Sequence, residues 1–362
     1  MKLPIDLKAV IEAATDIESA RNTPVSVSVL IDDSAPGDVA AHVRSAFVGA
    51  GARARVTVGY FVGPAFSPYE GDDMAVIVAG FSEEVGRRAA EIRAAGVPVM
   101  VVTSMPRLVA DMASAYGNPI PEGDLVAPEG VEGCEAESDA ACESGEVAGA
   151  NAQSPEILDA PIPIDAAAAA ALDRRMGEWV VAACREKRLA LALSFPFVRR
   201  PLSLEAVSAT SLQNAGIGLV LFIPGADMPL MTLNQAKMLL QIAAAYGEPM
   251  SAARAKELAA IVGGAFACRS VARQVAGAVP AIGWAVKAGV GYAGTKAMGL
   301  AAVEYFERGG NIAGLAGVVS TATAKATQIA GDVAATPAGA RVLSTVKTAV
   351  RQGAASVLKK TE

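Results

Sequence analysis

A long acidic segment divides this chain of 362 residues, and it constrains the fold more than any other feature. From Leu108 to Asp165 there are 13 Asp and Glu residues and no Lys or Arg. A stretch with low hydrophobicity and charges of one sign buries too little apolar surface to offset the entropy lost on ordering. Residues 119–164 are therefore predicted to be a disordered linker. It would join two domains, residues 1–118 and residues 165–362, and the chain length also favours two domains.

The first predicted domain alternates strand-like and helix-like segments. Apolar or β-branched runs predict strands at Val25–Ile31, Met74–Ala79 and Val97–Thr103, and alternating apolar residues predict a fourth at Ala54–Phe61. Amphipathic patterns predict helices at residues 4–22, 37–49 and 83–95. Strand–helix–strand units form parallel sheets with right-handed crossovers, so we expect a small Rossmann-like α/β domain.

The turn after the first predicted strand is the place where a sheet of this kind binds ligands. It carries Asp32, Asp33, Ser34 and Gly37, which are the candidates for a cofactor- or nucleotide-binding site. A phosphate-binding loop needs glycines and a Lys, whereas this turn has two aspartates and no Lys, and GxGxxG is absent. Binding of Mg²⁺ by the two aspartates is an alternative. We favour a solvated acidic turn in which Ser34 caps the next helix.

Other chemistry-bearing residues give no metal or cofactor motif. The four cysteines, of which Cys134 and Cys142 lie in the acidic segment, form no CxxC pair, and His42 is the single histidine. Neither a zinc site nor any other cofactor is therefore expected. The first residues are too polar and acidic for a signal peptide, which predicts reduced thiols in the cytosol.

The second predicted domain, residues 165–362, reads as helical throughout. Apolar periodicity predicts helices at residues 165–188, 232–246, 251–273, 282–308, 311–333 and 337–360. Small residues four positions apart are typical of close helix contacts, and they occur at Gly263 and Ala267, at Gly277 and Ala281, and at Ala285, Gly289, Ala293 and Ala297. A membrane span needs about 20 apolar residues, and Asp227 and Lys287 interrupt the two longest apolar runs. A re-entrant or interfacial hairpin therefore fits better than a span.

Eight charged residues of this domain are candidates for contacts with a membrane or a partner. Asp227 is expected to close a turn, to cap a helix or to mark a function. Arg269 and Arg273 are expected to pair with Glu257 or with lipid headgroups, whereas Lys287 and Lys296 are expected to snorkel or to face an interface. Arg341, Lys347 and Arg351 lie on the predicted helix at residues 337–360, which is basic and amphipathic, as is typical of a helix on a membrane surface. In the alternative, the apolar stripe of this helix packs on the preceding helices. The eight residues are Asp227, Arg269, Arg273, Lys287, Lys296, Arg341, Lys347 and Arg351.

Charge is distributed unevenly along the chain. Residues 1–187 hold 14 Lys and Arg against 29 Asp and Glu, a net charge of −15, whereas residues 188–362 hold 17 against 8, a net charge of +9. A basic apolar half suits an anionic membrane surface. Nucleic acid is not an expected partner because the basic residues are scattered and rarely alternate with aromatics. In the alternative interpretation, the acidic segment is held against the basic half of the same chain.

Two stretches of the helical half resemble a known family. They are LVLFIPGADMPLMTLNQAKMLLQIAAAYG, from Leu219, and ELAAIVGGAFACRSVARQVAGAVPAIGWAVKAGVGYAGTKAMGLAAVEYFERGG, from Glu257. With their surroundings, Phe195 to Gly310, about a third of the chain, this region resembles the YcjF-type family of bacterial proteins of unknown function. The resemblance implies a membrane-associated helical domain that is often fused to Era-like GTPase domains. It also implies that the α/β domain occupies the position of a degenerate G domain. Where a GTPase carries NKxD, however, this chain has Ser104-Met105-Pro106-Arg107.

Together these features predict a non-enzymatic scaffold or regulatory protein that associates with a membrane, with a protein partner or with copies of itself. The expected location is the cytoplasmic side of the bacterial inner membrane, or else the cytoplasm. A nucleotide-dependent switch with a degenerate GTPase-like pocket is the alternative function.

Overall fold

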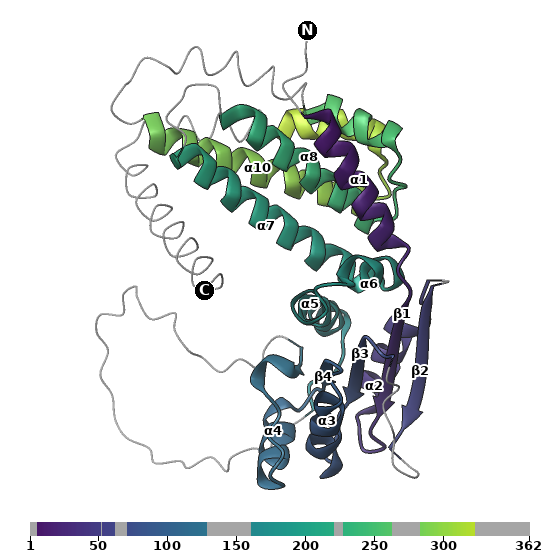
Figure 1. Ribbon diagram of the computed structural model, residues 1–362. Helices are drawn as coiled ribbons and strands as arrows, with labels where there is room; N and C mark the ends of the chain where they lie inside the picture. Colours follow the sequence, from purple (N-terminus) through teal and green to yellow (C-terminus); the bar gives the residue numbers. More distant parts are fainter. Residues whose placement is uncertain are drawn as a thin grey trace, which may run out of the picture. The chain divides into compact units, whose positions relative to one another are not determined.

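The computed structural model describes residues 6–51, 53–61, 71–128, 161–220, 227–262 and 283–322. The chain divides into two compact units (Figure 1). One unit comprises Pro24–Val198, and the other comprises Met1–Thr23 together with Arg199–Glu362. The backbone therefore passes between the two units twice, so the first unit is inserted into the sequence of the second. We call them the sheet unit and the helical unit.

The sheet unit is built on five parallel strands in the order β2-β1-β3-β4-β5. The strands are β1 (Val25–Ile31), β2 (Ala54–Tyr60), β3 (Met74–Val78), β4 (Val99–Val102) and β5 (Leu125–Val126). The central strand β3 is buried along its whole length, as its continuous apolar sequence predicts, whereas β2 at the edge is only partly buried. The four predicted strands are confirmed to within two residues at each end.

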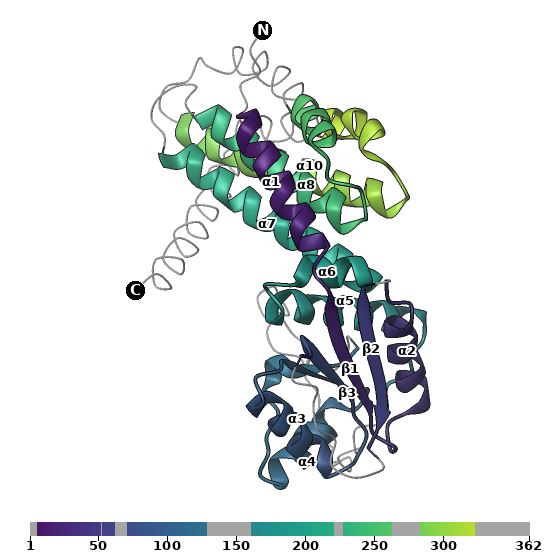
Figure 2. The same cartoon turned by 45° about the vertical axis from the view of Figure 1, so that its right-hand side comes forward.

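Helices cover both faces of this sheet. Helix α2 (Gly37–Val48) lies on one face, and α3 (Glu84–Ala94) and α4 (Pro106–Ala115) lie on the other (Figure 2). This follows from the strand order, because right-handed crossovers that add strands on opposite sides of β1 and β3 place their helices on opposite faces. Apolar residues of α3 and α4, including Val85, Ile92 and Val109, form a core with Leu30 and Ile77 of the sheet.

Two further helices complete the sheet unit, α5 (Ala166–Ala183) and α6 (Arg188–Ser194). Asp173 of α5 pairs with His42 of α2 at 2.8 Å, and Trp179 of α5 donates to Asp124 beside β5 at 3.2 Å. Just after α6, the ring of Phe195 lies 4.9 Å from that of Phe47 at the end of α2.

These contacts differ from the predicted division at residues 118 and 165. Helix α5 belongs to the sheet unit, where it contacts β5 and α6. Within the predicted linker, residues 122–126 form a 3₁₀ turn (Glu122–Asp124) and the strand β5, while residues 129–160 lie outside the described part of the chain.

The helical unit contains α1 (Leu7–Arg21), α7 (Pro196–Val220, whose first residues belong to the sheet unit), α8 (Asp227–Ala245), a helical segment at residues 252–262, α10 (Gly283–Glu307) and a 3₁₀ turn (Ile312–Gly314). The N-terminal helix α1 belongs here because Glu18 accepts the Met250 N–H at 3.1 Å and Arg21 donates to the Gly247 carbonyl at 3.2 Å. Of the helices that the structure describes, none is both long and apolar enough to cross a bilayer.

Candidate functional site

The carboxyl edge of the sheet between β1 and β3 is the position at which a ligand-binding site is expected. Chain connections leave β1 and β3 in opposite directions there, and such a topological switch point is where open parallel sheets bind ligands. The loop after β1 carries Asp32, Asp33, Ser34 and Gly37, the four residues that the sequence nominated. The loop after β3 carries Gly80 and Ser82.

Asp32 ties these two loops together. It is 3% exposed. Its Oδ1 accepts the Ser34 N–H at 3.1 Å, and its Oδ2 accepts the Ser34 hydroxyl at 2.8 Å and the N–H groups of Gly80 and Ser82 at 2.9 and 3.3 Å. The Ser34 Oγ in turn accepts the Phe81 N–H at 2.9 Å. The carboxylate therefore acts as an internal acceptor for four donors, and we call these contacts the Asp32 staple.

Close backbone contact reinforces the staple. A Cβ placed on Gly80 would lie 2.3 Å from the carbonyl carbon and oxygen of Ser34 and 2.5 Å from the Ala35 nitrogen. Contacts this short with backbone do not occur in proteins, so only glycine fits at position 80 in this loop arrangement. The two loops meet directly at the switch point.

The structure corrects the predicted acidic turn in two respects. Asp33 is exposed as expected, but Asp32 is buried, because its hydrogen bonds replace those of water. Ser34 does not cap the next helix either: Pro36 is the N-cap residue of α2 and supplies no side-chain bond, while Asp38 Oδ1 accepts the Val39 N–H at 2.8 Å. Gly37 is exposed at the start of α2. Within the described ranges, no cluster of acidic, histidine or cysteine side chains could hold a metal ion.

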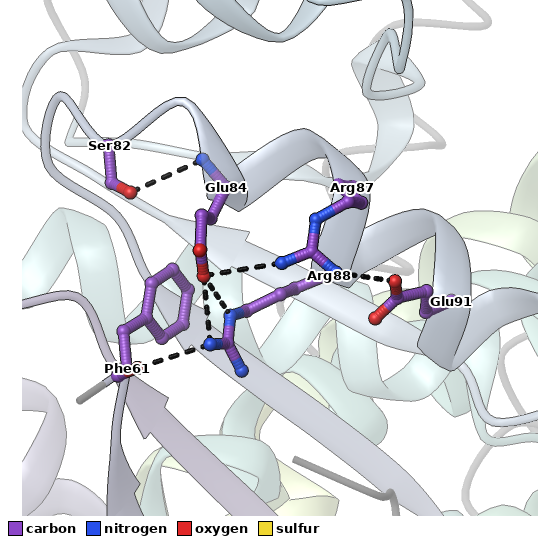
Figure 3. A network of polar contacts seen from close by, with 6 residues as sticks. All are labelled: Phe61, Ser82, Glu84, Arg87, Arg88 and Glu91. Carbon is purple, nitrogen blue, oxygen red and sulfur yellow. Dashed lines mark hydrogen bonds and ion pairs between the residues drawn. The ribbon is translucent and has the colours of Figure 1, made fainter. Parts of the chain in front are cut away.

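A buried arginine lies on the α3 side of the sheet (Figure 3). Arg88 is 7% exposed, and it donates to Glu84 at 2.8 Å and to the Phe61 carbonyl at 3.1 Å. Its guanidinium also lies 4.5 Å from the centre of the Phe61 ring. The hydrogen bond and charge of Arg88 hold the pKa of Glu84 below its usual value. The cation is thus neutralised and fixed, and it links α3 to the end of β2.

A short segment without regular secondary structure lies at the carboxyl edge, against the loop after β4 and the start of α2. We call residues 161–165, which precede α5, the strap. The Ile162 N–H donates to the Ser104 carbonyl just after β4 at 3.1 Å, and the Ile164 N–H donates to Asp38 Oδ2 at 3.0 Å. Asp165 then caps α5, accepting the Ala168 N–H at 2.8 Å, as predicted. The sequence assigned residues up to 164 to the linker, so the docking of this segment was missed.

The helical unit holds a buried polar network that the sequence did not reveal. Asn214 of α7 donates to Thr295 of α10 at 3.0 Å and to the Met231 carbonyl of α8 at 3.3 Å, and it accepts from Asn234 at 3.1 Å. Gln235 of α8 also donates to Thr295, at 2.8 Å. Three helices are therefore joined by amide and hydroxyl groups in an apolar interior. Polar residues within apolar helices were the available signal, and three of the four, Asn214, Gln235 and Thr295, are buried.

The predicted contact residues of the helical unit are only partly described. Lys296 is exposed and lies over the ring of Tyr292, 5.5 Å from its centre. Asp227 is the first residue of α8, which begins five residues before the predicted helix at 232. Lys287 lies within α10. Arg269, Arg273, Arg341, Lys347 and Arg351 lie outside the described residues.

No family model, curated protein or solved structure matches this chain.

Proposed function

We propose that this protein is a non-enzymatic scaffold or regulatory protein. In this proposal the helical unit associates with an anionic membrane surface or with other copies of the chain, and the sheet unit receives a partner. Its location would be the cytoplasmic side of the bacterial inner membrane. The resemblance to the YcjF-type family supports the same role.

The observation that carries the proposal is the Asp32 staple. The strand order supports the finer description of the sheet unit as Rossmann-like, and in such units the switch point is the usual ligand site. Here the staple engages both carboxylate oxygens of Asp32 and joins the two loops. An edge held closed by its own hydrogen bonds suits a unit that binds through its surface rather than one that cradles phosphates.

The packing chemistry of the helical unit supports association. Gly299 of α10 meets the side chain of Val207 of α7 so closely that an added Cβ would lie 2.4 Å from a Val207 methyl group. Small residues at helix crossings and amide–hydroxyl bonds between helices are the means by which helices associate in and near lipid. Both occur between α7, α8 and α10.

Vesicle flotation tests the membrane part of the proposal. The full chain should float with vesicles containing anionic lipid at low salt but not with neutral vesicles. Changing Arg341, Lys347 and Arg351 to Gln should weaken this binding about 100-fold, since each cation near an anionic leaflet contributes about 1 kcal/mol. As a matched control, Lys8, Lys237 and Lys256, which are exposed, are changed to Gln. Equal binding by both triple variants would refute the assigned membrane surface.

Two measurements separate the alternatives. Light scattering after size-exclusion chromatography reports self-association of the same chains. Equilibrium dialysis against GTP and ATP tests the nucleotide-dependent switch. Micromolar nucleotide binding that is lost in Gly37→Glu would favour the switch over the scaffold.

A further inference from the structure

The strap has the sequence Pro-Ile-Pro-Ile-Asp, and its exposure alternates along the chain. Pro161 and Pro163 are exposed, whereas Ile162 and Ile164 are half-buried. The segment thus directs its isoleucines toward the protein and its prolines toward solvent. This is how an extended peptide sits on a recognition surface.

Every backbone N–H that the Pro-Ile-Pro-Ile stretch possesses is used for docking. Proline has no N–H, so residues 161–164 offer two donors, those of Ile162 and Ile164. One binds the Ser104 carbonyl and the other binds the Asp38 carboxylate. The prolines also restrict the free segment to extended conformations, which lowers the entropy cost of docking.

The two acceptors belong to different elements of the sheet unit. Ser104 follows β4, and Asp38 lies in the first turn of α2. Together they accept N–H groups two residues apart in the strap, which then turns so that the Asp165 N–H donates to the Pro163 carbonyl at 3.0 Å. The Ser104 side chain is 1% exposed, and its hydroxyl has no hydrogen-bond partner within the described part of the chain. The edge therefore offers two hydrogen-bond acceptors, a carbonyl and a carboxylate, which suit a peptide backbone better than an anion.

We propose that this edge, formed by the Ser104 carbonyl and the Asp38 carboxylate, is a recognition site for an extended protein segment that alternates proline with a branched aliphatic residue. The strap occupies the site in cis, and a partner protein binds by replacing it. The inference rests on the proposed role of the sheet unit as the receiver of a partner, and it names the chemistry of that partner.

A peptide of residues 158–166, with a fluorescent label, tests the site on the full chain by anisotropy. Ile164→Pro removes the donor to Asp38 from the strap but leaves the site intact. Because one hydrogen bond contributes about 1 kcal/mol, this variant should bind the peptide about fivefold more tightly than the unchanged chain. Ile164→Val, which keeps the N–H, should bind like the unchanged chain. Equal affinity of all three chains, or no binding to any of them, would overturn the proposal.

Two further measurements keep the test independent of how well the variant folds. In the unchanged chain, excess peptide should displace the strap and speed hydrogen exchange at the amides of Ile162 and Ile164, and unaltered protection of both would contradict displacement. A peptide N-methylated at the residue equivalent to Ile164 should bind at least about fivefold more weakly than the unmodified peptide, because it lacks the same hydrogen bond. Dimers of Ile164→Pro that form without peptide would assign the edge to a second copy instead. None of these readouts involves vesicles, so their failure is distinguishable from failure of the membrane proposal.

Discussion

Gly80 and Ser34 touch through their backbones, at the point where the chain leaves β3 and β1. Alanine at position 80 would place its Cβ 2.3 Å from the Ser34 carbonyl, and the loops would have to separate. We predict that Gly80→Ala lowers the free energy of unfolding of the sheet unit by about 3 kcal/mol. Gly37→Ala is the matched control, because nothing lies within 4 Å of its added Cβ, and it should stabilise by about 0.5 kcal/mol.

Tryptophan fluorescence can report on the sheet unit alone. The chain has two tryptophans, and Trp179 lies on α5 in this unit. In a Trp284→Phe background, urea unfolding followed at Trp179 would measure both glycine variants. If Gly80→Ala and Gly37→Ala had the same midpoint, the loops would not be in the contact described.

Asp32→Asn should also destabilise the sheet unit. An amide can present one oxygen where the carboxylate presents two, and its NH₂ group would face backbone N–H donors. Because hydrogen bonds to a charged group contribute more than neutral ones, we expect a loss of about 3 kcal/mol. Asp33→Asn makes the same chemical change at an exposed neighbouring residue, and it should change the free energy of unfolding by no more than about 0.5 kcal/mol. The same fluorescence measurement applies, and equal effects of the two substitutions would mean that the Asp32 staple does not stabilise the unit.

Substitution of alanine for two glycines of α10 should change the stability of the helical unit in opposite directions. Gly299→Ala forces a Cβ into the side chain of Val207 and should destabilise the helical unit by about 2 kcal/mol. Gly294→Ala meets nothing within 4 Å, and alanine favours helix, so it should stabilise by about 0.8 kcal/mol. Thermal unfolding followed by far-ultraviolet circular dichroism would show the two shifts. In a Val207→Ala background, the cost of Gly299→Ala should shrink, and an unchanged cost would place the strain elsewhere.

The docking of α1 should depend on pH through Glu18. Burial by itself would raise the pKa of Glu18, but hydrogen bonds from the Met250 N–H and from Arg21 outweigh it and hold the pKa below the usual 4.5. A carboxylate with a depressed pKa stabilises the folded state fully above its unfolded pKa and loses this contribution as pH falls through the folded pKa. The stability difference between the unchanged chain and Glu18→Gln should therefore be constant above about pH 5 and shrink below pH 4.5. Urea titrations across this range would reveal it, and a difference that grew on acidification would have the wrong sign.

Cys184 should resist alkylation while the sheet unit is folded. Burial, and then the charge of Asp73, raise the pKa of this thiol to about 12, so very little thiolate exists near neutral pH. In a chain whose other three cysteines are changed to Ser, iodoacetamide at about pH 8 should label Cys184 only after denaturation. Mass spectrometry would follow the reaction, and rapid labelling of the native chain would show that the thiol is accessible.

The strands could be predicted because their signal is local. A segment rich in β-branched residues at Val25–Ile31 and a continuous apolar run at Met74–Ala79 indicate strands wherever they pack. β5 has two residues and lies in an acidic context, so no local pattern distinguishes it. Its strand character comes from pairing with β4, which is a property of the folded chain.

The position of the Asp32 loop in the fold could be predicted from the sequence, but its contacts could not. The turn at Asp32 was nominated because it follows a strand, whereas its burial depends on N–H donors almost 50 residues away in the loop after β3. Likewise, the apolar faces of α1 and α5 indicate only that each helix packs against an apolar surface of the folded chain. Periodicity does not say on which unit, and both helices lie in the unit that the sequence did not assign to them.

Because the backbone passes between the units at residues 23–24 and again at residues 198–199, neither unit corresponds to one half of the gene. A fragment cut at residue 165 would separate the C-terminal helices from α1 and deprive the sheet of α5. Excision of residues 24–198 with a replacement loop, by contrast, would leave α1 and all but the first three residues of α7 in one continuous polypeptide. The sheet unit is thus an insertion whose two ends both continue into the helical unit. A different binding module could be grafted at the same two junctions, of which the first follows α1 and the second lies in the first turn of α7.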